Sequence, residues 1–255
     1  MLLAIDVGNT NTKLGYFNAH GKLVGNWRVT TARARTSDEY GVLFQAFFSS
    51  AHFELDHVEG IVVASVVPQV DRWLFEACEK YFRREPIQFT AATQKLIDVR
   101  TDRPLELGAD LAAGAIGAVA LHGSPVIVIN FGTATTFSAV SAPGAFLGAV
   151  IAPGIQISID ALATRTAKLP QVALAAPPSA IGRDTVTALQ SGIVFGAVGQ
   201  TEGMVARLRA EMGVPAKVVA TGGLADIVAS ETRVIDVVEP HLVLEGLRRH
   251  YDAIR

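Results

Sequence analysis

An internal repeat constrains the fold of this chain more than any other feature of its sequence. Three matches carry the repeat: Ile5-Asp6-Val7-Gly8 with Ile129-Asn130-Phe131-Gly132, Thr12 with Thr136, and Gly21-Lys22-Leu23-Val24-Gly25 with Gly144-Ala145-Phe146-Leu147-Gly148. The period is too long for a solenoid of short repeats. The repeat therefore predicts two structurally related halves, residues 1–115 and 116–255, which face each other across a cleft.

Both halves are predicted to be α/β and to open with three strands. Short apolar runs between turn residues predict strands at Leu2–Val7, Thr12–Phe17, Leu23–Val29, Gly60–Val67, Ile87–Thr90, Val126–Ile129, Thr135–Val140, Ala145–Val150, Lys217–Ala220 and Val234–Val238. Helical periodicity predicts a helix capped by Ser37 and further helices at Val70–Phe82, Asp110–Leu121, Ile155–Ala167, Thr185–Met212, Leu224–Ala229 and Leu242–Tyr251. Leu96–Glu106 is predicted to be irregular.

Charge and cysteine content narrow the function classes. A formal net charge of -2 over 255 residues gives no electrostatic reason to expect nucleic acid or an anionic membrane as partner. The longest apolar stretch, Leu111–Ile129, is interrupted by Gly123 and Pro125, whereas a membrane span needs about 20 predominantly apolar residues. Cys78 alone cannot build a disulfide framework. These features predict a soluble, cytoplasmic protein.

The two predicted hairpin tips have the chemistry of phosphate loops. The first combines a carboxylate, a glycine and small polar residues in the order Asp6, Val7, Gly8, Asn9, Thr10, Asn11, Thr12 and Lys13. Glycine allows close backbone approach, exposed N–H groups bind anions, and Asp6 can hold Mg²⁺ through water. The alternative is a tight hairpin that needs Gly and Asn for its turn. The second tip, Asn130–Thr136 with Thr133 in it, favours the nucleotide interpretation because a nucleotide cleft needs both sides.

Two more segments are candidates for the site. Thr221-Gly222-Gly223-Leu224 lies between a predicted strand and helix, where it either lets a nucleoside lie against the backbone or forms only a short turn. Asp110, at the start of an apolar helix, is a candidate catalytic base, and its alternative role is to cap that helix. The six histidines are scattered and have no metal-ligand spacing.

Taken together, these motifs resemble the type III pantothenate kinases of the acetate and sugar kinase/heat-shock 70/actin superfamily. The resemblance covers nearly the whole chain and rests on Asp6–Thr10, Leu107–Asp110, Phe131–Thr136, Ala152–Ile155, Ala167–Pro170, Ile181–Thr185, Gln190–Gly192, Thr221–Leu224 and Leu244–Arg248. It implies two ribonuclease H-like (actin-like ATPase) halves around a nucleotide cleft. It also implies ATP-dependent phosphorylation of pantothenate to 4'-phosphopantothenate, the first step of coenzyme A biosynthesis, by a homodimer whose substrate pocket is shared between subunits.

The resemblance also implies roles for particular residues. Asp6–Lys13 and Thr133 bind the ATP phosphates, and Asp110 is the base on the pantothenate hydroxyl. The substrate contacts are Thr101, Gly108, Ala109, Asp110, Leu111 and, from the neighbouring subunit, Thr185. Mg²⁺ is held through water by Asp6, and a monovalent cation (K⁺ or NH₄⁺) lies at the position of Asn130.

This chain departs from the family pattern at four positions. Leu111 stands where the family has an Arg that pairs with the pantothenate carboxylate, and Asn130 stands where it has an Asp linked to the monovalent cation. Ser138 replaces a second Asp, and Thr101 stands near an expected aromatic residue. Two hypotheses follow: an active pantothenate kinase, and a relative with lost or altered activity that acts as a binding or regulatory protein.

Overall fold

The chain forms two compact units in the computed structural model, which describes residues 1–166 and 169–255. The first unit comprises residues 1–98, 102–120 and 241–255, and the second comprises residues 99–101 and 121–240. The sequence prediction placed the last helix in the second half of the chain. In the structure this helix, α7 (Leu242–Ile254), belongs to the first unit because it packs against strands β1 (Leu2–Val7) and β4 (Gly60–Ser65).

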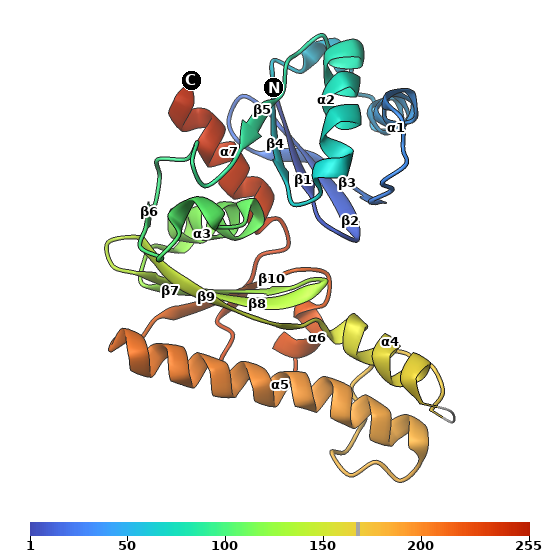
Figure 1. The fold of residues 1–255 in the computed structure, drawn as a ribbon, viewed down its shortest axis with the longest axis vertical. Coiled ribbons are helices and arrows are strands. Elements are labelled where there is room, and N and C mark those ends of the chain that lie inside the picture. The colour runs from blue at the N-terminus through green and yellow to red at the C-terminus, as the bar shows by residue number, and fades with distance from the viewer. Residues whose placement is uncertain (167–168) are drawn as a thin grey trace. The chain divides into compact units, whose positions relative to one another are not determined.

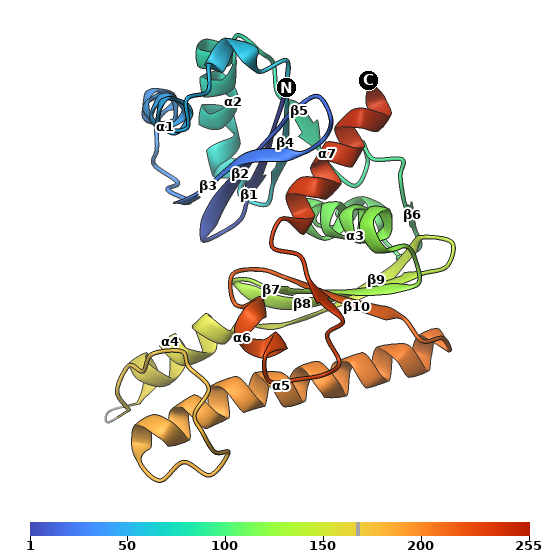
Figure 2. The ribbon, with the colours of Figure 1, turned by 180° about the vertical axis from the view of Figure 1, so that it is seen from behind.

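The first unit contains a five-stranded sheet with the order β3-β2-β1-β4-β5 (Figure 1). Strands β1, β2 and β3 are antiparallel neighbours, and β4 and β5 continue the sheet parallel to β1. Helices α1 and α2 lie on one face of the sheet and α7 on the other (Figures 1 and 2). The elements up to β5 are β1 (Leu2–Val7), β2 (Asn11–Phe17), β3 (Leu23–Thr30), α1 (Ser37–Ser50), a 3-10 turn (Leu55–His57), β4 (Gly60–Ser65), α2 (Pro68–Phe82) and β5 (Ile87–Phe89).

The core of the first unit lies between the sheet and helices α1 and α2. Leu3, Ile5 and Val7 alternate along β1 and face the buried rings of Tyr40 and Phe44 on α1. This alternation is the period of two that places every second residue of a strand on one face. Burial of one complete strand face holds Asp6 and the turn that follows it in place.

Helix α1 differs from its prediction at its first residues. Its N-cap is Thr36 and not Ser37: the Thr36 hydroxyl accepts from the Glu39 N–H, and the Glu39 carboxylate accepts from the Thr36 N–H. This reciprocal pair satisfies two N–H groups that a helix start otherwise leaves unpaired.

The second unit contains a six-stranded sheet with the order β11-β10-β7-β8-β9-β6. Its core lies between this sheet and helices α4, α5 and α6. Its elements are β6 (Asp98–Val99, whose Asp98 is counted with the first unit), β7 (Val126–Phe131), β8 (Ala134–Ser141), β9 (Ala145–Pro153), α4 (Ile155–Arg165), α5 (Thr185–Met212), β10 (Lys217–Thr221), α6 (Ala225–Ala229) and β11 (Val237–Val238).

The two sheets confirm the internal repeat. Strands β7, β8 and β9 are antiparallel neighbours, and β10 and β11 run parallel to β7. The order β9-β8-β7-β10-β11 is therefore the same as the order β3-β2-β1-β4-β5 of the first unit. Each unit also has the same irregularity between its second and third strands. In the first unit Val24 is the bulged residue, between the Tyr16–Gly25 and Phe17–Leu23 pairs. In the second unit Leu147 is the bulged residue, between the Ala139–Gly148 and Val140–Phe146 pairs. Both bulged side chains are 38% exposed.

The predicted match of Thr12 with Thr136 is wrong by one residue. In the first hairpin Val7 pairs with Thr12, and in the second Phe131 pairs with Thr135. The second tip is therefore one residue shorter than the first, and Thr136 corresponds to Lys13. Sequence matching without a gap at the tip could not detect this shift.

Two helices of the first unit touch backbone to backbone. Helix α3 (Ala109–His122) crosses α7, and a Cβ on Gly246 would collide with the Ala113 carbonyl. A Cβ on Gly117 would likewise collide with the Leu242 carbonyl. Because glycine allows this close approach, α7 fixes the position of α3, and with it the position of Asp110.

The remaining differences from the prediction are two short elements between residues 98 and 106 and the ends of several strands and helices. Within the stretch predicted as irregular, Asp98–Val99 forms the edge strand β6 and Pro104–Glu106 forms a 3-10 turn. Strand β4 ends at Ser65 rather than Val67, and β11 is limited to Val237–Val238. Helix α4 ends at Arg165, and Ala167, the predicted end, lies outside the described residues.

Candidate active site

Two carboxylates and one lysine come together at the site of the first unit. Asp6 lies at the end of β1 directly opposite Lys13 on β2, and Asp110 lies in the first turn of α3. The charges of Lys13 and Asp110 both act on the pKa of Asp6. The fold therefore joins two motifs that the sequence places far apart, the first hairpin tip and the start of the apolar helix.

Burial controls the protonation of both carboxylates. Asp6 is 7% exposed, and its pKa is raised from 3.8 to about 6. Loss of hydration is the main cause; the charge of Lys13 lowers the pKa, and the charge of Asp110 raises it. Burial also raises the pKa of Asp110, whereas backbone N–H groups of Leu111 and of Asp110 itself lower it, as does Lys13. A carboxylate with a raised pKa is a better proton acceptor in catalysis at neutral pH.

Replacing Asp6 with asparagine is expected to raise the free energy of unfolding of the unliganded protein at pH 8 by about 1–3 kcal/mol. With a folded-state pKa of about 6 and an unfolded-state value near 3.8, ionised Asp6 destabilises the folded state. This cost is absent at low pH, grows between about pH 4 and pH 6, and is complete above that range. Urea denaturation at about pH 5 and pH 8 measures this effect: Asp6→Asn should raise the free energy of unfolding more at pH 8 than at pH 5. An equal gain at both values would contradict the prediction, and the exposed Asp56→Asn is the control.

Asp110 also contributes to the start of α3, as its alternative role requires. The helix begins at Ala109, so Asp110 occupies the second helical position rather than the N-cap, and its carboxylate accepts from first-turn N–H groups. A Cβ on Gly108 would lie 2.8 Å from Oδ1 of Asp110. The absence of a side chain at position 108 leaves room for this carboxylate.

The first hairpin tip is braced by Thr31, a residue that the sequence prediction missed. The Thr31 hydroxyl donates to the Gly8 carbonyl at 2.7 Å and lies 2.9 Å from the Thr12 hydroxyl, and the Thr31 N–H donates to the Thr10 carbonyl at 2.9 Å. The Gly8 N–H donates to the Asn11 carbonyl at 3.0 Å. Asn9 and Thr10 are exposed at the tip, whereas Val7 and Thr12 are buried.

The second hairpin tip lies against two glycine loops of its own unit. A Cβ on Gly222, whose φ is +99°, would lie 2.5 Å from the Phe131 carbonyl and 2.7 Å from Oδ1 of Asn130. A Cβ on Gly154 would collide with the Thr133 carbonyl. Gly222 is thus needed for packing against this tip, whichever of its two predicted roles applies.

The second tip lacks the charges of the first. Asn130 pairs with Thr136 where Asp6 pairs with Lys13 in the first unit. The Thr136 hydroxyl is buried and has no hydrogen-bond partner among the described residues. Ser138 is buried farther along β8. Two neutral oxygen-bearing side chains at the strand end would bind a cation more weakly than a carboxylate would.

The predicted substrate contacts are divided between the units. Gly108, Ala109, Asp110 and Leu111 belong to the first unit, and Thr101 and Thr185 to the second. Leu111 is half-buried, and the Thr101 hydroxyl is buried without a partner among the described residues. Thr185 is exposed at the start of α5. It lines a pocket of about 480 Å³ together with Leu169, Gly182, Arg183, Asp184, Ala188 and Leu189.

Arg103, a cation shortly before Leu111 in the chain, forms an exposed ion pair. Its guanidinium donates to the Glu106 carboxylate at 3.1 Å, and both side chains are exposed.

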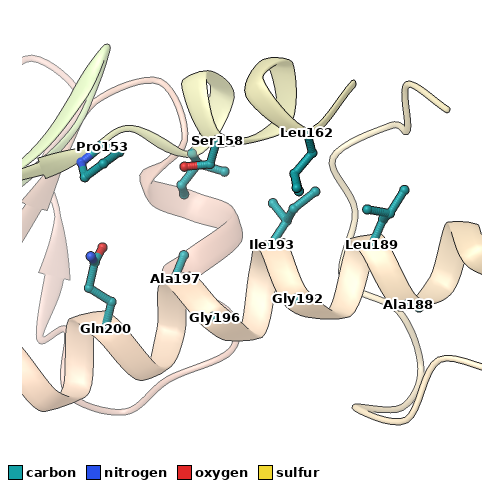
Figure 3. A pocket seen from close by; sticks show the side chains of 11 residues that line it. Pro153, Ser158, Leu162, Ala188, Leu189, Gly192, Ile193, Gly196, Ala197 and Gln200 are labelled. Carbon is teal, nitrogen blue, oxygen red and sulfur yellow. The ribbon is translucent and has the colours of Figure 1, made fainter. Parts of the chain in front are cut away.

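A second pocket of the second unit lies between α4 and α5 and has a volume of about 400 Å³ (Figure 3). Leu162 on α4 faces Ile193 on α5, and Gly192 and Gly196 form part of the α5 wall. Gly192, Gly196, Gly199 and Gly203 share one exposed face of α5. A Cβ at any of these four would meet no described atom within 4 Å. The backbone of α5 is therefore accessible along about three turns.

No three His, Cys, Asp or Glu side chains are grouped as a metal site anywhere in residues 1–166 and 169–255.

Among the described helices, none combines the length and the apolar character that a membrane crossing requires.

Comparisons with known proteins identify the family. The sequence profile of the family described as "Type III pantothenate kinase" matches residues 2–207. The chain is 48% identical to the type III pantothenate kinase of Myxococcus xanthus over 98% of both chains. It is 46% identical to that of Roseiflexus castenholzii over 100% of both chains.

Solved structures show the same fold at low sequence identity. The structure of (R)-2-hydroxyglutaryl-CoA dehydratase component A from Acidaminococcus fermentans matches with a TM-score of 0.58 and 15% identity, covering 100% of this chain and 99% of the other. The predicted α/β fold with two related actin-like ATPase halves is confirmed. On its sequence over the full length and on its fold, the chain belongs to the type III pantothenate kinase family.

Proposed function

We propose that this protein transfers the γ-phosphoryl group of ATP to the hydroxyl group of pantothenate, the first step of coenzyme A biosynthesis in the cytoplasm. The observation that carries the proposal is the grouping of Asp6, Lys13 and Asp110 with raised pKa values of both carboxylates. Phosphoryl transfer needs mainly positioning, charge neutralisation and one oriented proton acceptor. This grouping supplies all three and favours an active enzyme over the inactive alternative.

In the proposed reaction Asp110 accepts the proton of the pantothenate hydroxyl. The hydroxyl oxygen forms the new bond to the γ-phosphorus, the bond from that phosphorus to the β,γ-bridging oxygen breaks, and ADP leaves. Lys13, the cation beside both carboxylates, neutralises charge on the transferred group. The tip Asp6–Lys13 and Thr133 bind the phosphates, and Thr101 and Gly108–Leu111 bind pantothenate.

The oxygen ligands for cations in the proposed site are few. Asp6 is a single buried carboxylate, which suits Mg²⁺ because this ion keeps several waters and binds one or two carboxylates plus nucleotide phosphates. When bound, Mg²⁺ neutralises phosphate charge. Asn130 and the unpartnered Thr136 hydroxyl offer neutral oxygens for K⁺ or NH₄⁺. We expect weaker activation by these ions than a carboxylate at position 130 would give.

Formation of 4'-phosphopantothenate tests the function directly. The purified protein with ATP, Mg²⁺, K⁺ and pantothenate at millimolar concentration is expected to form this product, detected by mass spectrometry, together with one ADP per product. A product rate no higher than that of the same mixture without the protein would refute the proposal.

The exposed glycine face of α5 supports a homodimer in which a second copy packs on this helix. Glycines at this spacing let two helix backbones approach closely, and the exposed Leu162 of α4 lines the same pocket. Thr185 begins α5, so that a dimer built on this helix would bring the threonine of each copy to the interface.

Gly196→Leu is expected to convert the dimer to a monomer, measured by light scattering after gel filtration. Leucine is a better helix former than glycine by about 0.8 kcal/mol, so the loss would not arise from unfolding of α5. Ala46→Leu adds similar bulk to an exposed position of α1 and should leave the dimer intact. A dimer that persists in Gly196→Leu would place the interface elsewhere.

A further inference from the structure

We propose that Thr31 is a positioning residue that holds the first hairpin tip in the conformation that receives the nucleotide phosphates. The inference rests on the proposed function of this tip. Thr31 directly follows β3, whose last residue, Thr30, pairs with Asn11 at the start of β2. This register places Thr31 beside the turn that joins β1 to β2.

Three hydrogen bonds tie Thr31 to three different residues of the tip. Its N–H donates to the Thr10 carbonyl, its hydroxyl donates to the Gly8 carbonyl, and its hydroxyl oxygen lies 2.9 Å from that of Thr12. A hydroxyl has one proton. Because the Thr31 proton is used on Gly8, the donor between the two threonines is Thr12.

The two hydroxyls therefore form a directed chain from Thr12 through Thr31 to the Gly8 carbonyl. Each hydrogen bond in such a chain polarises and strengthens the next. Thr12 is 1% exposed, and its proton is committed to this internal chain rather than to a phosphate. Thr12, which the family resemblance places among the phosphate ligands, acts in this arrangement together with Thr31 on the shape of the tip.

A tip held in advance binds phosphate better than a mobile one because its ordering need not occur during binding. Without the Thr31 hydroxyl, the Gly8 carbonyl and the Thr12 hydroxyl both lose their partner, while the β2–β3 pairing next to them remains. The effect should therefore concentrate on the nucleotide and spare the acceptor substrate.

Thr31→Val removes the hydroxyl and keeps the branched shape of the side chain. We expect the Kd for ADP, measured by titration calorimetry, and the KM for ATP to rise about 10-fold, and the KM for pantothenate to change less than about 2-fold. Thr31→Ser restores a hydroxyl and is expected to return both nucleotide constants to within about 3-fold of the parent protein. Thr12→Val combined with Thr31→Val should cost little more than Thr31→Val alone, because both changes break the same chain.

The matched control is Thr30→Val, an identical change at the adjacent, exposed position. ADP affinity in Thr31→Val equal to that in Thr30→Val would overturn the inference. An equal loss of ATP and pantothenate affinity, or failure of Thr31→Ser to restore ADP binding, would also overturn it. The calorimetric titration needs no acceptor substrate. If the parent protein binds ADP but does not phosphorylate pantothenate, the proposed function is refuted. The role of Thr31 is then still tested by comparing the ADP affinities of Thr31→Val and Thr30→Val.

Discussion

Asp110→Asn is expected to lower kcat for pantothenate phosphorylation by about 10²–10⁴-fold, the usual contribution of a positioned general base. Asparagine keeps the size of the side chain and its carbonyl oxygen, so that the first turn of α3 can still be capped, but it accepts no proton from the pantothenate hydroxyl. The KM for ATP should change by less than about threefold, because the phosphate loop is not altered. Initial rates with both substrates varied measure these constants.

The control for Asp110 is the same chemical change at Asp56, which is exposed in a 3-10 turn of the first unit. Asp56→Asn should leave kcat unaltered. If Asp110→Asn retained more than about a third of kcat while unfolding at the same urea concentration as the parent protein, Asp110 would serve only the start of α3.

Leu111→Arg is expected to lower the KM for pantothenate by about 30–100-fold. The family pattern has arginine at this position, where it pairs with the pantothenate carboxylate. A charge-assisted contact of this kind contributes about 2–3 kcal/mol, and each 1.4 kcal/mol corresponds to a factor of ten. Leu111 is half-buried next to Asp110, so a longer side chain can extend toward solvent without entering the core. The measurement is the dependence of initial rate on pantothenate concentration.

Two comparisons isolate the charge at position 111. Leu111→Met changes the shape without adding charge and should leave the KM close to that of the parent protein. Pantetheine has an amide in place of the carboxylate, so Leu111→Arg should not improve its KM. An unchanged or higher KM for pantothenate in Leu111→Arg would show that an arginine at position 111 does not bind the pantothenate carboxylate in this protein.

The internal repeat made most of the fold predictable. Apolar runs bounded by turn residues predicted all six strands that open the two halves, three in each, since burial and turn formation depend on residues close in sequence. The matching glycines Gly25 and Gly148 mark the same bulge in both sheets. The one-residue difference between the tips was missed because it depends on strand register, which local composition does not determine.

The candidate site was predictable only in part. The motifs that contain Asp6 and Asp110 were found from their residue types, but their proximity depends on how α7 holds α3, a contact between distant segments. Thr31 belongs to none of the motifs. Only the pairing of Asn11 with Thr30 shows that the next residue reaches the tip.

The assignment of α7 to the first unit has a consequence for biosynthesis. Residues 121–240, nearly the whole second unit, are synthesised before α7, and until then the first unit lacks the helix that packs against β1 and β4. A domain generally folds as a unit once its chain is available. The first unit therefore cannot be completed until the last residues of the chain are available, and one face of β1 and β4 stays uncovered for the whole synthesis of the second unit.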